Sequence, residues 1–447
     1  MSHIPGTAVR RIGALVALAF AGAWPVRPAH AQDPKPPADT AAADTTKDAL
    51  AREIDRLLRD TAGVPLPDYP RAAPAQQPRT FQSLNPDISA IGELLADLSP
   101  QRAATLEDGS RFLMRETELG IQAIVDPFFR ADFFIGVHPE EVEVEEAYVT
   151  ALALPGGLQA RVGRFHLPLG KINLTHRPEI LTVDYPLVLR EYFGEEGFAS
   201  SGLGLSRIFT PLGFFQEVQV YALSGIEREE EHGEEEGEAE EAEVIERQRD
   251  VFEQLAFLGH LRNYWDLSSA ANVELGFSAA VGSVERLVPL PCDPSENCPL
   301  DQPPPVQQTF ETQAFYGADF TMRWRPPQRS IYRSFAWNTE VVANDTPEQL
   351  WWGGFTQAQW QLSRRWYLGA RFDAVQTLEE HEETEGAEPA EPEWRRAASG
   401  YLTFFPSEFS RFKLGVEREL GALASDDPWR VILQTTFAIG PHRPHAF

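Results

Sequence analysis

Two histidines, each set among glutamates, are the residues of this chain whose type and spacing best suit metal binding. His232 lies within residues 227–250 and His381 within residues 378–393. Carboxylate and imidazole groups together can bind divalent cations such as Zn²⁺ or Ca²⁺. Each run has a single histidine, so neither specifies a fixed tetrahedral site. We therefore expect at most loose collection of divalent cations in solvated loops, and no other cofactor.

The same two runs carry most of the excess negative charge. Residues 227–250 contain 13 acidic and 3 basic residues, a balance of −10, and residues 378–393 contain 8 acidic and no basic residues, a balance of −8. Together they supply −18 of the net charge of −28. Such runs repel themselves and stay solvated. Nucleic acid is an unsuitable partner, because phosphate backbones need clustered Lys and Arg.

Alternation of apolar and polar side chains is the main pattern from about residue 86 onward. Between residues 309 and 325, Phe320 and Trp324 share one face, whereas Asp319 and Arg323 share the other. This period of two is that of a β-strand. We predict sixteen strands, at 86–97, 110–125, 128–138, 142–153, 158–166, 199–209, 214–223, 252–262, 271–281, 309–325, 331–343, 351–363, 366–377, 397–405, 409–418 and 429–440.

The connections between these strands alternate in length. Tight turns at 126–127, 211–213 and 326–327 contrast with long segments at 167–198 and 282–308. Short turns at one end and long loops at the other are typical of an all-β, transmembrane antiparallel barrel. Both chain ends then lie on the periplasmic side, which requires an even number of strands. We expect about sixteen, with fourteen and eighteen as alternatives.

Three regions follow from this interpretation. Residues 1–31 combine two arginines, a short apolar run and a small-residue ending, which predicts a secretory signal peptide. Residues 32–85, rich in Pro and Ala, form a periplasmic tether with one short helix, and residues 86–447 form the barrel. The terminal aromatic Phe447 resembles the ending by which the barrel-assembly machinery recognises its substrates. The expected location is the outer membrane of a Gram-negative-type bacterium, in contact with membrane lipid and lipopolysaccharide.

The only two cysteines, Cys292 and Cys298, lie in one short Pro-containing segment. An exported chain meets an oxidising compartment, which favours a disulfide that closes this loop. A metal site would need more nearby ligands than the segment offers.

Several short motifs between residues 112 and 205 resemble the phosphate-selective porin O and P family. They are Arg115-Glu116-Thr117-Glu118-Leu119-Gly120, Glu146-Ala147-Tyr148, Val162-Gly163-Arg164-Phe165, and Leu189-Arg190 leading to Gly202-Leu203. The resemblance implies a sixteen-stranded pore, often a homotrimer. The anion-binding members depend on clustered basic residues, which the sequence does not match here, so phosphate selectivity is not part of the expectation.

In a pore, side chains that face the lumen decide which ions enter. The polar faces of the predicted strands supply the pore-lining set: Glu116, Glu118, Arg130, Asp132, Arg161, Glu217, Glu274, Asp319, Arg323, Glu340, Arg371, Asp373, Arg411, Lys413 and Glu417. By analogy with porins, the long segment 167–198 is the best choice for a constriction loop, with Arg177, Asp184, Arg190 and Glu191 as its candidate residues. The face is least certain in strands 142–153 and 158–166, because Glu146 and Arg164 break the alternation.

These features predict a porin-like channel for passive diffusion of small hydrophilic solutes or ions, with a weak cation preference set by the acidic loops. Two alternatives stay open. One is an outer-membrane receptor or metal-collecting transport protein, although the Pro-rich segment before the first strand is short for a folded plug. The other is a closed structural or adhesive barrel. No common hydrolase or phosphate-binding motif is present, so we expect no enzyme activity.

Overall fold

The structure is a computed structural model that describes residues 86–101, 105–106, 109–139, 141–226, 244–245, 255–289, 306–347, 349–377, 393–421 and 429–440. The chain divides into two compact units, Met1–Gln77 and Pro78–Phe447. All described residues belong to the second unit. The expected signal peptide and tether helix, the two cysteines, His232, His381 and Phe447 lie outside the described residues, so those expectations stay predictions.

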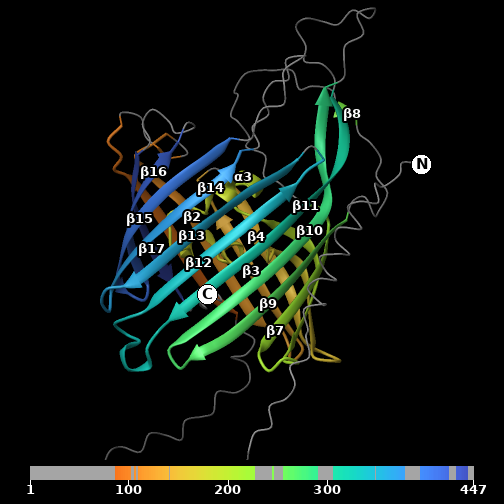
Figure 1. The fold of residues 1–447 in the computed structure, drawn as a ribbon, viewed down its shortest axis with the longest axis horizontal. Helices are drawn as coiled ribbons and strands as arrows, with labels where there is room; N and C mark the ends of the chain where they lie inside the picture. The colour runs from red at the N-terminus through yellow and green to blue at the C-terminus, as the bar shows by residue number, and fades with distance from the viewer. Residues whose placement is uncertain are drawn as a thin grey trace, which may run out of the picture. The chain divides into compact units, whose positions relative to one another are not determined.

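Sixteen antiparallel strands close into a barrel, as the sequence predicted (Figure 1). Each strand pairs with its neighbours along the chain, and β1 pairs with β17 to close the ring. The strands of the ring are β1 (Asp87–Asp97), β2 (Phe112–Ile124), β3 (Phe129–Val137), β4 (Val142–Leu154), β5 (Leu158–His166), β6 (Ala199–Phe209), β7 (Phe215–Leu223), β9 (Ala256–Ser268), β10 (Ala271–Pro289), β11 (Val306–Trp324), β12 (Phe335–Asp345), β13 (Leu350–Gln361), β14 (Trp366–Gln376), β15 (Trp394–Ser407), β16 (Ser410–Leu420) and β17 (Trp429–Ile439).

The largest departures from the predicted bounds occur around the long hairpin of β10 and β11. Each of these strands is 19 residues long, so the predicted loop 282–308 is partly strand. A two-residue strand, β8 (Val244–Ile245), pairs in parallel with the outer end of β11. Beyond residue 281 polar and apolar residues no longer alternate, as Glu285-Arg286 and Leu287-Val288 show, although pairing with β11 continues to residue 289.

Burial along β14 shows why these sequences form membrane strands. Leu368 and Phe372 are exposed on the outer face, whereas Arg371 and Asp373 between and beside them are buried. A strand with apolar side chains outside and charged side chains inside suits a barrel in lipid, because closure pairs every backbone group. The apolar outer surface is thus an expected feature of the fold.

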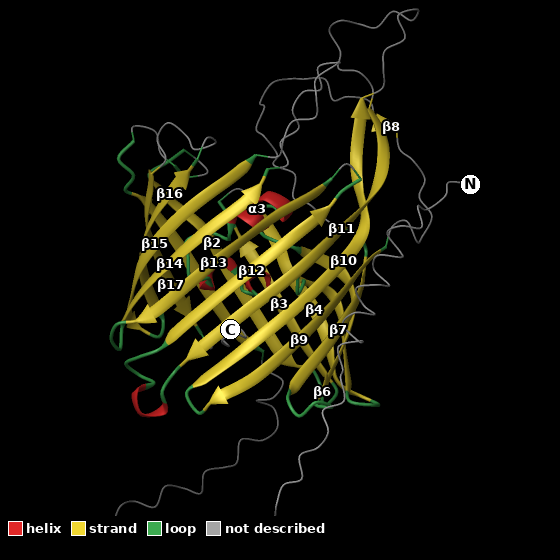
Figure 2. Cartoon of the chain, in the orientation of Figure 1, coloured by secondary structure: helices red, strands yellow, loops and turns green. Residues whose placement is uncertain are grey.

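The two ends of the barrel differ in their connections (Figure 2). At one end short turns join the strands, including one closed by the Asp126 carboxylate, which accepts hydrogen bonds from the N–H groups of Phe128 and Phe129. The 3₁₀ turn η4 (Pro327–Arg329) lies at the same end. Trp352, Trp366 and other exposed tryptophans lie at or near strand ends, the positions of an interfacial aromatic belt.

Candidate functional site

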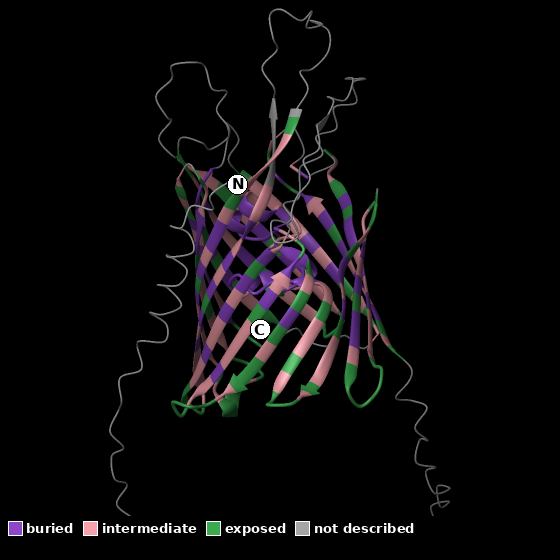
Figure 3. Cartoon of the chain, turned by 90° about the vertical axis from the view of Figure 1, so that its right-hand side faces the viewer, coloured by how far each residue is buried: buried purple, intermediate pink, exposed green. Residues whose placement is uncertain are grey.

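Residues 167–198, which we call the inward loop, join β5 to β6 and lie inside the ring of strands. The loop contains two 3₁₀ turns, η2 (Ile172–Leu174) and η3 (Arg177–Glu179), and one short helix, α3 (Leu187–Phe193). Its groups contact side chains of β2, β4, β10, β12, β14, β16 and β17, which stand on opposite sides of the barrel. Figure 3 shows buried segments within the barrel.

Two β-bulges in the barrel wall each turn two consecutive charged side chains toward the interior. The register between β1 and β2 shifts at Arg115, and the register between β3 and β4 shifts at Glu145. A bulge adds a residue to one strand and re-aims its side chains. As a result Arg115 and Glu116 are both buried, and so are Glu145 and Glu146. The broken alternation noted at Glu146 has this bulge as its cause.

Aromatic residues fix one side of the inward loop to the wall. Phe193 of α3 stacks on Phe198, with ring centroids 4.6 Å apart, and tilts against Phe315 of β11 at 4.7 Å. All three rings are at most 1% exposed. This apolar contact excludes water from that part of the interior and holds α3 in place.

Acidic side chains of β2 and β4 contact the loop on one side of the barrel wall. Nδ1 of His176 lies 3.0 Å from Glu118 and 2.9 Å from Glu145, and its Nε2 lies 3.0 Å from Glu146. Burial alone would lower the pKa of His176, but the three carboxylates outweigh burial and raise that pKa well above its usual value. The neighbouring Arg177 of the loop contacts Glu116 at 3.5 Å on the same wall.

The start of the loop is held by carboxylates from the opposite wall. Oε1 of Glu340, on β12, accepts hydrogen bonds from the backbone N–H groups of Lys171 at 3.0 Å and Ile172 at 2.9 Å. Nζ of Lys171 contacts Glu274 of β10 at 2.6 Å. Burial, together with the charge of Arg323 and against the attraction of Glu274, lowers the pKa of Lys171 to about 8.

Basic side chains surround the middle of the loop at Asp184. Its carboxylate contacts Arg115 of β2 at 2.7 Å and also contacts Arg430 of β17. Burial would raise the pKa of Asp184, but Arg430, Arg115 and Arg190 outweigh burial and hold that pKa well below its usual range. Further basic side chains from β14 and β16 bind backbone carbonyls of the same stretch, through Arg371, Arg411 and Lys413.

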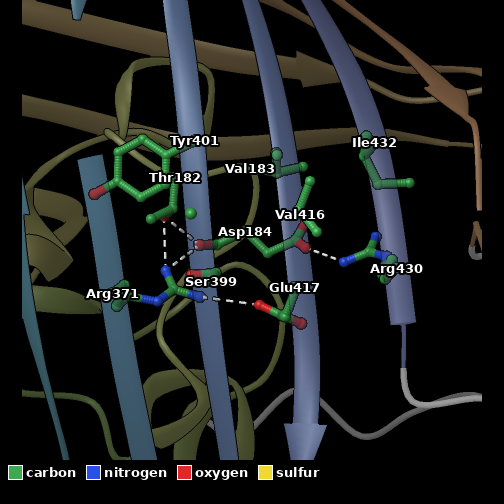
Figure 4. Close-up of a pocket in the computed structure, with 12 residues that line it drawn as sticks. Thr182, Val183, Asp184, Arg371, Ser399, Tyr401, Val416, Glu417, Arg430 and Ile432 are labelled. Atoms are coloured by element: carbon green, nitrogen blue, oxygen red, sulfur yellow. Dashed lines mark hydrogen bonds and ion pairs between the residues drawn. The ribbon is translucent and has the colours of Figure 1, made fainter. Parts of the chain in front are cut away.

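A cavity lies between this stretch of the loop and strands β14 to β17 (Figure 4). Its charged lining residues alternate in sign: Asp184, Arg371, Glu417 and Arg430. Arg371 donates to the hydroxyl of Thr182 at 2.6 Å and also contacts Glu417 at 3.7 Å. The cavity has a volume of about 20 Å³, which is room for about one water molecule.

The fifteen residues predicted to line the pore fall into two groups by burial. Nine are less than 4% exposed: Glu116, Glu118, Asp132, Glu274, Asp319, Glu340, Arg371, Asp373 and Lys413. The other six are half-buried: Arg130, Arg161, Glu217, Arg323, Arg411 and Glu417. Most of the first group contact the inward loop, directly through its side chains or through its backbone. Their part in conduction stays a proposal.

The four constriction-loop candidates all lie on the inward loop, and each contacts another charged residue. Arg177 contacts Glu196 at 2.6 Å in addition to Glu116. Arg190 lies 3.6 Å from Glu195, and Glu191 lies 3.8 Å from Arg395 of β15. Asp184 joins two strands through ion pairs, with Arg115 of β2 and Arg430 of β17.

Sequence reasoning missed several residues of this site, above all Arg115, Glu145, Lys171 and His176. The first two were hidden by the bulges. The other two could have been found by a simpler argument: every ionisable side chain of a loop that enters a barrel must find a partner, because burying an unpaired charge is costly. All such residues of 167–198 were therefore candidates.

The fold and the site together define a class: a sixteen-stranded outer-membrane barrel with a loop folded into its interior. Apolar side chains cover its outer surface and charged ones its interior, which is the arrangement of a protein that spans the outer membrane. Within the described part of the chain, no helix is long and apolar enough to cross a membrane.

A solved outer-membrane protein shares this fold. The structure of a loop L8 deletion mutant of OmpT, an outer-membrane protein of Vibrio cholerae, matches with a TM-score of 0.50 and 6% identity, covering 79% of this chain and 99% of that chain. OprB of Pseudomonas putida gives a TM-score of 0.47 at 9% identity, covering 79% of this chain and 94% of that one. An anion-selective porin from Comamonas acidovorans gives 0.47 at 7% identity, covering 80% and 99%. The first of these similarities shows the fold alone.

Sequence comparisons add one relative. An uncharacterised protein of Aquifex aeolicus (strain VF5) is 26% identical over 359 residues, which cover 76% of this chain and 71% of the relative. No family model matches the sequence. The expected resemblance therefore stands at the level of porin-like barrels.

Proposed function

We propose that this chain is an outer-membrane channel through which small hydrophilic solutes or ions diffuse passively, with a weak preference for cations. The observation that carries the proposal is the inward loop, held on opposite walls by ion pairs such as Asp184–Arg115 and Lys171–Glu274. A loop fixed in this way narrows the interior and lines it with charge, which is how porins select solutes. We propose no enzyme activity.

The cation preference would come from the two acidic segments, 227–250 and 378–393, of which only residues 244–245 and 393 are described. Both follow strands at the long-loop end of the barrel. Their combined charge of −18 would concentrate cations there, since a charged mouth raises local counter-ion concentration about tenfold or more. Salt screens exposed charge beyond about 8–10 Å, so the preference should weaken as ionic strength rises.

A second candidate is an anion pathway along β14 to β17. The basic side chains that gather at Asp184 favour it, namely Arg115, Arg371, Arg411, Lys413 and Arg430. They come from four strands far apart in the sequence. That distribution is why the sequence alone showed no basic cluster. Carboxylates interleave with them, so we rank this candidate second.

A distant relationship to the phosphate-selective porin O and P family would be consistent with the shared barrel, without implying phosphate selectivity. We also propose assembly as a homotrimer, contact with membrane lipid and lipopolysaccharide, and recognition of Phe447 by the barrel-assembly machinery. Chemical cross-linking of the native membrane tests the trimer directly.

The deciding experiment is single-channel recording of refolded protein in a planar bilayer under a salt gradient, at low and at high mean salt. Cation-favouring steps whose selectivity falls at high salt support the first candidate. Replacing the glutamates of 378–393 by glutamine should reduce the preference, whereas the control Asp266→Asn, at the opposite end, should not. Anion-favouring steps support the second candidate. Absence of steps from protein with heat-modifiable gel migration contradicts both and favours the closed barrel or the receptor.

A further inference from the structure

We propose that Glu118, Glu145 and His176 form a binding site for one divalent transition-metal ion, which clamps the inward loop to the wall of the barrel. The three residues come from β2, β4 and the loop respectively. Their ligand atoms lie within 4.8 Å of one another. The inference is independent of channel activity, because a clamp of this kind would serve an open or a closed barrel equally well.

The ligand chemistry suits a borderline cation. One imidazole nitrogen and two carboxylate oxygens are ligands that zinc accepts at about 2.0–2.2 Å. Oε2 of Glu118 and Oε2 of Glu145 both face Nδ1 of His176, at 3.0 and 2.9 Å. One ion placed among these three atoms reaches all of them with small shifts. The three side chains are at most 5% exposed, so the site is shielded from the solvent.

The other nitrogen of His176 is already oriented as a metal ligand requires. Nε2 of His176 lies 3.0 Å from Oε2 of Glu146, whose Oε1 accepts a hydrogen bond from the backbone N–H of His166 at 2.8 Å. Histidines that bind metals nearly always donate their second N–H to a carboxylate or carbonyl, which fixes the tautomer. The ring also packs against Phe134, with centroids 4.6 Å apart. Nδ1 is thereby directed at the two ligand carboxylates.

A second observation favours a bound cation: Glu116 is aimed into this group and only 1% exposed. Neither of its carboxylate oxygens accepts a hydrogen bond from the described residues, and neither does Oε1 of Glu145. The carboxyl group of Glu116 adjoins that of Glu145, and the nearest guanidinium, of Arg177, stands 3.5 Å away.

Buried carboxylates of this kind need a compensating charge, because isolated buried anions are strongly destabilised. Four glutamates of β2 and β4 meet one histidine and one arginine of the loop in this cluster. A divalent cation held by Glu118, Glu145 and His176 supplies two positive charges beside Glu116 and offsets its charge as well. The competing explanation is protonation, in which a doubly protonated His176 alone bridges the glutamates.

Titration of refolded, chelator-stripped barrel with Co²⁺ separates the two explanations. We expect one equivalent to bind, with visible absorption bands of low-coordinate cobalt that Zn²⁺ abolishes. Glu145→Gln and His176→Gln should remove these bands. Glu146→Gln should weaken binding about 10–100-fold, the usual effect of losing a carboxylate behind a ligand histidine.

Matched variants test the location of the ion. His260→Gln changes another buried histidine, which bonds to Ser278 outside the cluster, and should leave binding intact. A double variant of His232 and His381 tests the acidic runs and should also bind normally. Heat-modifiable gel migration establishes that each variant is folded.

Several results would overturn the clamp. They are no cobalt binding at micromolar metal by folded wild type, unchanged binding by Glu145→Gln, or binding that depends on His232 and His381. If the His176 variant does not fold, X-ray absorption of zinc-loaded wild type decides the question. Scattering from one imidazole ring supports the site, and a shell of oxygen ligands alone contradicts it.

Discussion

The carboxylate of Glu340, on β12, lies directly against Gly170 at the start of the inward loop. A Cβ atom on Gly170 would stand 2.2 Å from Oε2 of Glu340, and the backbone of Gly170 has a positive φ of 81°. The other oxygen of Glu340 accepts the hydrogen bonds of the next two N–H groups, of Lys171 and Ile172. The loop can turn here onto β12 only because residue 170 has no side chain.

Gly170→Ala should loosen the inward loop. The substitution combines the cost of a left-handed alanine, about 1–2 kcal/mol, with displacement of a carboxylate that holds two backbone groups. We expect faster trypsin cleavage within 167–198 and larger, noisier conductance steps. Gly213→Ala is the matched control, because Gly213 has the same φ of 81° but open space around its Cβ position. Equal effects of the two substitutions would contradict the contact with Glu340.

Phe315→Ala should detach the aromatic side of the loop. The ring of Phe315 is 1% exposed and packs against Phe193 of α3, and loss of a buried Phe costs about 3–5 kcal/mol. We expect a lower temperature for the shift to unfolded gel migration, together with faster proteolysis of the loop. Phe277→Ala, on the outward face of the adjacent strand at 48% exposure, should change loop proteolysis little. Equally fast proteolysis in both variants would show that the Phe193 contact does not hold the loop.

Asp184→Asn should shift selectivity toward anions. The substitution leaves Arg115 and Arg430 without the carboxylate that both contact, and breaking one partner of a buried pair costs about 3–5 kcal/mol. Reversal potentials under a salt gradient measure the shift. Asp266→Asn is the control, because Asp266 is exposed and lies on β9 near the end of the barrel with the short turns. A reversal potential identical to wild type would mean that ions do not pass Asp184.

The barrel itself was predictable from the sequence, and the reason is the strict period of two in its strands. In β14, Leu368 and Phe372 alternate with Arg371 and Asp373, and that alternation determines which of them face the interior. All sixteen predicted strands are present, within a few residues at most ends. The ends of β10 and β11 were less predictable, because these strands stay paired beyond residue 281, where polar and apolar residues no longer alternate.

The arrangement of the site was less predictable, because it depends on contacts between distant residues. The segment 167–198 was identified as the constriction candidate, yet the partners of Asp184 are 69 and 246 residues away, at Arg115 and Arg430. Bulges hid Arg115 and Glu145, since an extra residue reverses the assignment of faces along part of a strand. No local pattern specifies that His176 meets glutamates from two strands.

Lys171 should make ion selectivity depend on pH above neutrality. Burial and the charge of Arg323 lower the pKa of Lys171 to about 8, despite its contact with Glu274. The lysine is therefore charged at pH 7 and largely neutral at pH 9.5. Its folded-state pKa lies below the value of about 10.4 for lysine in water, so deprotonation between these values favours the folded state. A change in selectivity across this range would thus not reflect unfolding.

Loss of this positive charge should raise the cation-to-anion permeability ratio roughly fivefold between pH 7 and pH 9.5, because the charge repels cations and attracts anions by similar energies. A unit charge about 8 Å from an ion path in water-like surroundings contributes about 0.5 kcal/mol. Lys171→Met should show the high-pH ratio at pH 7 and no pH dependence. Arg262 and Arg323, the other basic groups beside Lys171, keep their charge over this range. The acidic neighbours Glu274, Asp319 and Glu340, which accepts a hydrogen bond from the backbone N–H of residue 171, remain in the variant. A pH dependence retained in Lys171→Met would assign the titration to another group and place Lys171 away from the ion path.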